Sequence, residues 1–116
     1  MGVKASWKVE ELMELNEYQK LAQDTAVYPK SAATDGLVYA VLALCGETGE
    51  LANKLKKSLR SQTPPDVMVL ADELGDCLWY CGAVAERLGL SLQTIAEMNL
   101  EKLAERRAKN AIKEHA

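Results

Sequence analysis

Apolar residues recur every three or four positions along most of this 116-residue chain. Such spacing places them on one face of an α-helix, whereas a half-buried β-strand would need strict alternation of apolar and polar residues. No run of alternating β-branched residues and no Asn-Gly turn interrupts the pattern. The sequence therefore predicts an all-α protein, and its length fits one domain.

Breaks in this pattern divide the chain into four expected helices. The first covers residues 6–26, with Ser6 as its N-cap. The Tyr28-Pro29 step ends it, because a residue that precedes proline avoids the α region. The second expected helix covers residues 37–59, after a loop of small and polar residues.

The second half of the chain carries further end signals. Thr63 is expected to cap a third helix, and Gly89 is expected to follow the end of that helix as its C-cap. Ser91 is expected to cap a fourth helix. Residues 109–116 are polar, and we expect them to fray.

Short connections between these helices predict an antiparallel four-helix bundle that forms a single domain over residues 1–116. Two apolar seams are expected to fill its core: on the second helix Leu37, Val41, Leu44, Leu51, Leu55 and Leu59, and on the third Val67, Leu70, Ala71, Leu74, Leu78, Cys81, Ala85 and Leu88. Because few core side chains are large, we expect a homo-oligomer that buries the remaining apolar surface.

The composition excludes several classes of protein. His115 is the only histidine, which rules out a histidine base, a histidine-rich zinc site and a di-iron bundle. The absence of phenylalanine, a net charge of −3 and a pI of about 5.2 argue against nucleic-acid binding. No apolar run is long enough for a membrane helix, and an odd number of cysteines favours a reducing compartment. We therefore expect a cytoplasmic protein that binds neither nucleic acid nor membrane.

Two pairs of acidic residues lie on the second and third expected helices. Glu47 and Glu50 are three residues apart, as are Glu73 and Asp76, so each pair shares one face of its helix. Three of the four acids have no basic residue three or four positions away, whereas Glu50 has Lys54. Both pairs lie beside apolar seams, so we expect them at the edge of the core, where their repulsion requires a positive charge to offset it.

If these two helices pack side by side, the four carboxylates form a site with oxygen ligands alone. That donor set suits a hard divalent cation, and Mg²⁺ is the expected ion, with Mn²⁺ as the second choice. Gly46, Gly49 and Gly75 lie beside the acids, which suggests a close helix approach or room for a ligand. The alternative is an acidic surface that water solvates.

A magnesium ion held by carboxylates usually meets substrate phosphates. Asn99 lies within the apolar seam of the fourth helix, and Lys102 and Arg106 follow it at i+3 and i+7. Lys54 adds another cation on the strip of the second helix that carries the acids. We interpret these residues together as phosphate contacts, although either cation on the fourth helix, taken alone, fits a solvated face better.

Three segments carry a further signal: Leu44-Cys-Gly-Glu-Thr-Gly-Glu-Leu51, Asp72-Glu-Leu-Gly-Asp-Cys-Leu-Trp-Tyr80 and Asn99-Leu-Glu-Lys-Leu103. Together they resemble the MazG-like all-α nucleoside triphosphate pyrophosphohydrolases, over about residues 15–107. The most specific part is Glu-x-x-Glu followed, on the next helix, by Glu-x-x-Asp.

The resemblance implies an activity and a set of site residues. Such enzymes cleave a nucleoside triphosphate between its α and β phosphates, which gives a monophosphate and pyrophosphate. The implied metal ligands are Glu47, Glu50, Glu73 and Asp76, and the implied phosphate contacts are Lys54, Asn99 and Lys102. Tyr80 would line the sugar or base pocket, and Gln19 is a weaker candidate for the same pocket.

The resemblance also implies a homodimer or homotetramer with the pocket near a subunit interface. The chain departs from the family in its last residues, where an arm containing glycine and arginine is often found. Arg106 and Arg107 would partly replace the phosphate contacts of that arm.

The expected chemistry is metal-assisted hydrolysis, with one carboxylate as the base that accepts a proton from the attacking water. We predict Glu50 for this role, because it lies furthest from the seam and Lys54 can orient it. Removal of damaged nucleotides is one biological role of such an activity. Two alternatives stay open: a non-catalytic helical interaction module, and a pyrophosphohydrolase of another nucleotide such as phosphoribosyl-ATP.

Overall fold

The computed structural model describes residues 13–28 and 35–115. Its elements are α1 (Leu15–Gln23), α2 (Asp35–Ser61), α3 (Val67–Arg87) and α4 (Leu92–His115), and the described residues form no strand. The predicted all-α class with four helices is therefore confirmed. Over the described residues, none of the helices combines the length and apolar character needed to cross a membrane.

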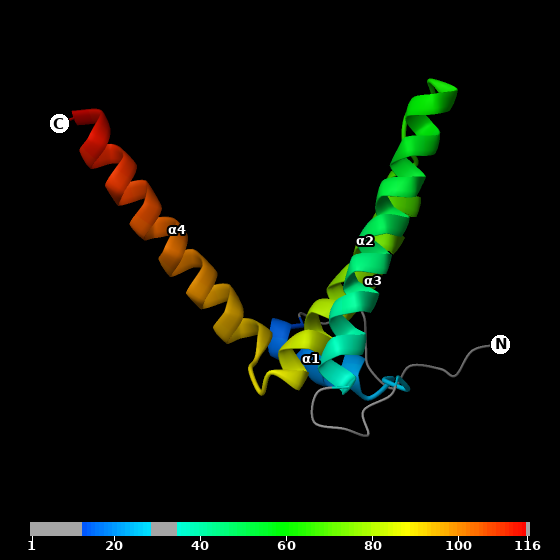
Figure 1. The fold of residues 1–116 in the computed structure, drawn as a ribbon, viewed down its shortest axis with the longest axis horizontal. Helices are drawn as coiled ribbons and strands as arrows, with labels where there is room; N and C mark the ends of the chain where they lie inside the picture. Colours follow the sequence, from blue (N-terminus) through cyan, green and yellow to red (C-terminus); the bar gives the residue numbers. More distant parts are fainter. Residues whose placement is uncertain (1–12, 29–34, 116) are drawn as a thin grey trace.

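The helices form two arms that share a base. α2 and α3 pack side by side as a long hairpin, and α1 packs against α3 at the base of that hairpin. α4 contacts α1 and α3 only near its own start and then runs away from the hairpin (Figure 1). The molecule is therefore more open than the compact bundle that the sequence suggests.

The first helix is shorter than predicted. α1 begins at Leu15 instead of following a cap at Ser6, which lies outside the described residues. It ends at Gln23 rather than at residue 26, because the N–H groups of Thr25 and Ala26 donate to carbonyl oxygens three residues back instead of four. The tighter turn brings Thr25 to the base of the hairpin.

The predicted cap of the third helix is wrong. Asp66, not Thr63, caps α3, and its side chain accepts hydrogen bonds from Met68 N (3.0 Å) and Val69 N (3.3 Å). Thr63 belongs instead to the end of α2, where its N–H donates to the carbonyl oxygen of Ser58. Two consecutive prolines lie between Thr63 and Asp66 and separate the end of α2 from the start of α3.

Side chains of α1 help to begin α4. Leu92 N donates to Gln19 Oε1 (2.7 Å) and Gln93 N donates to Asn16 Oδ1 (3.1 Å). Thr94 N donates to Ser91 Oγ (3.0 Å), so the predicted Ser91 cap is confirmed. Gly89, with φ of 73°, follows α3 as predicted. α4 continues to His115, past residue 109, where the sequence suggests fraying.

The core consists mainly of small side chains. Tyr28, Ala40 and Ala83 form its buried centre, with Trp79 and Tyr80 packed against it. The predicted seams are wrong in large part, because these members are exposed: Val41, Leu55, Leu59, Val67, Leu74, Leu78 and Leu88. They lie on faces of the hairpin that neither α1 nor the diverging α4 covers.

Candidate active site

Three acidic side chains meet between α2 and α3. Glu47 comes from α2, Glu73 and Asp76 come from α3, and one carboxylate oxygen of each lies within 4.8 Å of the others. Glu47 and Glu73 are half-buried, whereas Asp76 is exposed. The packing of the two helices thus brings together acids that lie far apart in the sequence; we call these three residues the acidic cluster.

Glu50, the fourth predicted ligand, lies outside the acidic cluster. It is exposed and lies one turn beyond Glu47 on α2. Three of the four predicted acids are therefore brought into one site, with the fourth beside it.

The electrostatics of the acidic cluster favour a bound cation. Partial burial, followed by the negative charges of Asp76, Glu73 and Glu50, raises the pKa of Glu47 above its ordinary value. Among the described residues, no lysine or arginine forms an ion pair with these acids. Three carboxylates with no imidazole or thiolate among them are the donors that Mg²⁺ or Mn²⁺ prefers, so the residues fit such an ion.

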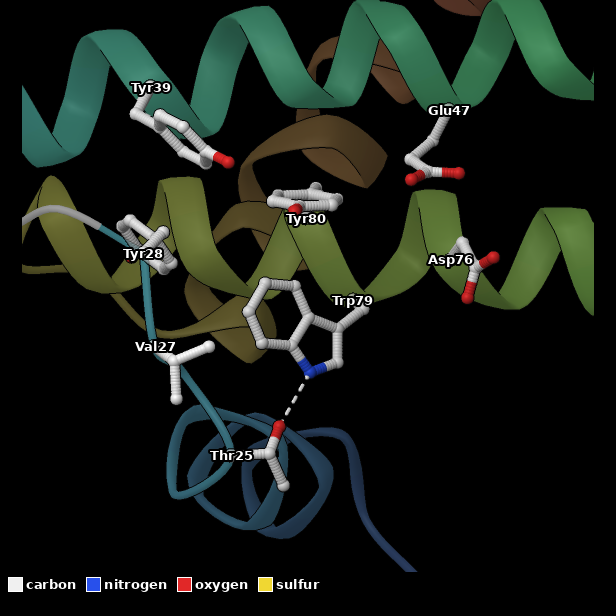
Figure 2. A pocket seen from close by; sticks show the side chains of 8 residues that line it. All are labelled: Thr25, Val27, Tyr28, Tyr39, Glu47, Asp76, Trp79 and Tyr80. Carbon is white, nitrogen blue, oxygen red and sulfur yellow. Dashed lines mark hydrogen bonds between the residues drawn. The ribbon is translucent and has the colours of Figure 1, made fainter.

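A cavity of about 460 Å³ adjoins the acidic cluster (Figure 2). Its wall is formed by Thr25, Val27, Tyr28, Tyr39, Glu47, Asp76, Trp79 and Tyr80. Figure 2 shows the carboxylate of Glu47 reaching from α2 toward α3, which carries Asp76 and Tyr80. Aromatic rings thus line one part of the cavity, and two members of the acidic cluster line another.

The aromatic side chains hold one another in place. The rings of Tyr28 and Tyr39 stack with centroids 5.5 Å apart, and the rings of Trp79 and Tyr80 meet edge to face at 4.8 Å. Trp79 Nε1 donates a hydrogen bond to Thr25 Oγ1 (3.1 Å), which ties α3 to the turn after α1. These contacts fix an aromatic wall of the kind on which a planar ring can stack.

Tyr80 lies in this wall, one turn beyond Asp76. Burial is the first cause of its raised pKa, and the neighbouring Tyr39, Glu47 and Asp76 add to it. The hydroxyl group therefore stays protonated at neutral pH and can donate a hydrogen bond.

The structure assigns Gln19 a different role from the predicted substrate contact. Its amide nitrogen donates to Glu86 Oε2 (3.1 Å) and to the carbonyl oxygen of Leu90 (3.0 Å), and its amide oxygen accepts from Leu92 N. The side chain is buried. Its hydrogen-bonding groups are thus used to hold the turn between α3 and α4.

The predicted phosphate contacts are spread over both arms. Lys54 is half-buried on α2, two turns beyond Glu47. Asn99, Lys102 and Arg106 are exposed on α4, which does not contact α2 within the described part of the chain. The single chain therefore does not bring these three residues to the acidic cluster.

The glycines near the acids do not mark a close helix approach. A Cβ atom added at Gly46, Gly49 or Gly75 would meet nothing within 4 Å. The structure instead has room beside the acids at these three positions, which is the other reason we expected for glycine there.

Sequence reasoning pointed to Trp79 and Tyr80 as pocket residues and missed Thr25, Tyr28 and Tyr39. Tyr39 lies two turns before Glu47 on α2, at a spacing that signals a shared side of the helix. Tyr28 was expected only at a helix end, and Thr25 only inside the first helix. Nothing in the sequence pattern relates either residue to Trp79, because their contact depends on how α1 packs against α3.

Comparisons with known proteins show which family the chain resembles in sequence. The family model of the MazG nucleotide pyrophosphohydrolase domain matches residues 39–111. The chain is 40% identical over 107 residues to the "Gene 37 protein" of Mycobacterium phage L5, across 86% of this chain and 94% of that protein. No solved structure matches it significantly. By its sequence and its all-helical fold, the chain belongs to the MazG nucleotide pyrophosphohydrolase family.

Proposed function

We propose that the protein is a Mg²⁺-dependent nucleoside triphosphate pyrophosphohydrolase, which converts a ribo- or deoxyribonucleoside triphosphate to the monophosphate and pyrophosphate. The observation that carries this proposal is the position of the acidic cluster at an aromatic cavity. A triphosphate needs a cation near its phosphates, and a base needs a ring to stack on. Membership of a pyrophosphohydrolase family supports the same assignment.

Glu47, Glu73 and Asp76 would hold Mg²⁺, with Mn²⁺ as a substitute, and Glu50 would complete the acidic lining of the site. The bound ion would neutralise phosphate charge and make water more acidic. The residues themselves would orient the triphosphate so that its α phosphate faces the acids and its base faces the aromatic wall.

Glu50 is our candidate for the general base. It lies beside the acidic cluster but outside it, and among the described residues no cation pairs with it. A carboxylate in that position is available to accept a proton from the attacking water. Lys54, one turn further along α2, would orient it or contact a phosphate.

Residues of the aromatic wall and of α4 complete the proposed substrate site. Tyr80 and Trp79 would contact the base or the sugar, while Asn99, Lys102 and Arg106 would contact phosphates. We also propose a homodimer or homotetramer, because so many apolar side chains of the hairpin are exposed. A cytoplasmic location and a role in removing damaged nucleotides remain part of the proposal.

Release of pyrophosphate from a panel of ribo- and deoxyribonucleoside triphosphates with Mg²⁺ tests the activity. We expect Glu50→Gln and Asp76→Asn to lower kcat at least a hundredfold, while Asp72→Asn, an acid on α3 one turn before Asp76, serves as the matched control. Full activity in both test variants would refute the assignment. If the protein hydrolyses phosphoribosyl-ATP and none of the triphosphates in the panel, the proposed substrate is wrong, whereas the proposed release of pyrophosphate is retained.

The effect of Mg²⁺ and nucleotide on thermal stability distinguishes the proposed enzyme from a non-catalytic interaction module. Mg²⁺ with a non-hydrolysable triphosphate should raise the melting temperature, because both bind the native state. Asp76→Asn should remove most of that rise. A melting temperature indifferent to Mg²⁺ and nucleotide would favour the interaction module.

A further inference from the structure

Trp79 and Thr25 border two cavities. Both line the cavity of about 460 Å³ that adjoins the acidic cluster. Both also line a second cavity of about 160 Å³, whose other lining residues lie in α1 or just before it: Met13, Tyr18, Leu21 and Ala22. We call this second space the apolar cavity, because most of its lining side chains are apolar and none belongs to the acidic cluster. The indole ring of Trp79 therefore has a place open to it on either side.

The hydroxyl group of Thr25 has a fixed role in hydrogen bonding. Its single proton is donated to the carbonyl oxygen of Ala22 (2.6 Å), so toward the indole its oxygen can only accept. The indole N–H of Trp79 can only donate, and Nε1 meets Thr25 Oγ1 at 3.1 Å. Figure 2 shows the nitrogen of the indole pointing at Thr25. The donor of Trp79 is thus matched by an acceptor that has no other state available.

Backbone hydrogen bonds place Thr25 for this contact. Thr25 N donates to the carbonyl oxygen of Ala22, and Ala26 N donates to that of Gln23, each at 3.0 Å. These bonds do not involve the side chain of Thr25. A change from threonine to valine therefore removes the hydroxyl group while it keeps the turn and the shape of the side chain.

The remaining ring contacts of Trp79 define its orientation less sharply. The indole meets the rings of Tyr80 and Tyr28 edge to face, with centroids 4.8 Å and 6.2 Å apart. Aromatic pairs tolerate a range of separations and tilts, whereas a hydrogen bond weakens steeply as its angle closes. The bond to Thr25 is therefore the directional restraint on the indole, and the apolar cavity is the space into which an unrestrained ring would turn.

We infer that Thr25 is a positioning residue for the substrate: its hydroxyl group holds the indole of Trp79 at the cavity beside the acidic cluster and keeps the ring out of the apolar cavity. Because the indole N–H is engaged by Thr25, Trp79 contributes a stacking surface and no hydrogen bond to a base. This inference rests on the proposed function, and it adds which residue sets the position of the stacking ring.

Thr25→Val tests the inference through KM. Thr25 is exposed, so water can bond the freed indole N–H, and the substitution should move the ring more than it destabilises the fold. We expect KM for the triphosphate to rise about three- to tenfold with kcat nearly unchanged, a smaller effect than removal of a whole stacking ring. Thr25→Ser keeps the hydroxyl group and should restore KM. Thr63→Val, an exposed threonine at the other end of the hairpin, is the matched control.

A double-mutant cycle shows whether Thr25 acts through Trp79. Phenylalanine has no N–H group, so in a Trp79→Phe background Thr25→Val should raise KM no further. An equal rise in both backgrounds would mean that Thr25 acts without Trp79, and the inference would fail. An unchanged KM in Thr25→Val alone, or a fall in kcat in its place, would also overturn it.

A spectroscopic measurement does not depend on activity. Trp7→Phe leaves Trp79 as the only tryptophan of the chain, so ¹⁵N NMR shows a single kind of indole N–H. We expect one signal with proton contacts to Thr25, and in Thr25→Val a shifted or doubled signal with contacts to Leu21 and Ala22. An indole signal unchanged by Thr25→Val would overturn the inference while the proposed function stands. If the wild-type protein hydrolyses no triphosphate, the proposed function fails, and this signal still decides whether Thr25 positions the ring.

Discussion

The backbone N–H of Leu92 donates a 2.7 Å hydrogen bond to Oε1 of Gln19, which lies 73 residues earlier in the chain. The same side chain donates to the carbonyl oxygen of Leu90 and to Glu86. One amide of α1 therefore holds both the end of the α3–α4 turn and the first residue of α4. Together with the bonds from Asn16 and Ser91, it anchors the first turn of α4 at the base of the molecule.

Gln19→Leu should destabilise the protein, because it keeps the volume of the side chain and leaves Leu92 N–H buried without an acceptor. A lost buried hydrogen bond of this kind costs roughly 1–3 kcal/mol. Urea unfolding at one fixed protein concentration measures the change. Gln93→Leu is the control, because Gln93 is exposed and its side chain only donates to Glu97 on the same helix. Equal losses in both variants would contradict the role of Gln19.

Glu47→Gln should stabilise the metal-free protein by a few tenths of a kcal/mol, because it removes like-charge repulsion within the acidic cluster. The melting temperature in EDTA measures the gain, and added NaCl should reduce it by screening. With Mg²⁺ present, the order should reverse, because the variant loses a ligand. Glu101→Gln, an exposed acid on α4, is the control. A variant less stable than wild type in EDTA would contradict this prediction.

The effect of Glu47 on stability should also depend on pH, and it should be most unfavourable when the carboxylate is charged. Because the pKa of Glu47 is raised in the folded state, the folded protein binds the proton more tightly than the unfolded chain. The contribution of Glu47 therefore becomes more favourable as pH falls through its folded pKa. The stability difference between Glu47→Gln and wild type in EDTA should shrink between pH 7 and pH 4.

Tyr80→Ala should raise KM more than it lowers kcat, because Tyr80 lines the cavity on the side of the aromatic wall. Loss of a stacking surface costs roughly 1–3 kcal/mol per base, which corresponds to about a 5- to 150-fold change. Tyr80→Phe keeps the ring and should restore most of the affinity. Steady-state kinetics separates the two parameters. A large fall in kcat with unchanged KM would mean that Tyr80 acts on the chemical step.

Gly75→Ala should stabilise the isolated protein by about 1 kcal/mol, the usual difference between these residues inside a helix. The added methyl group would meet nothing within 4 Å. Thermal unfolding without nucleotide measures the change, with Ala71→Gly, at an exposed position one turn earlier, as the opposite control. A loss of stability in Gly75→Ala would show that another molecule occupies the space beside Gly75.

The sequence predicted the helices because they follow from apolar spacing, and it predicted the acidic cluster because two spaced pairs of acids lie on helices that were expected to be neighbours. Glu73 and Asp76 share one face of α3 wherever that helix packs. Glu47 joins them as long as α2 and α3 are neighbours. Half of the aromatic wall was missed, because the contact between Thr25 and Trp79 depends on where α1 docks. The position of α4 was missed for a related reason, since its first turn is held by side chains of α1 that lie more than 70 residues away in the sequence. Apolar spacing also predicts that Leu74 lies on a buried face of its helix, but it does not show which surface buries that face.

The buried centre of the chain is built around Tyr28, Ala40 and Ala83, and no large side chain of the described residues is fully enclosed. So few enclosed contacts leave an isolated chain with little to oppose its conformational entropy. If two copies cover each other's exposed apolar side chains, folding and association become one equilibrium. Dilution should then unfold the helices and abolish activity over the same concentration range. The amount of this protein in a cell would then set the fraction that is folded.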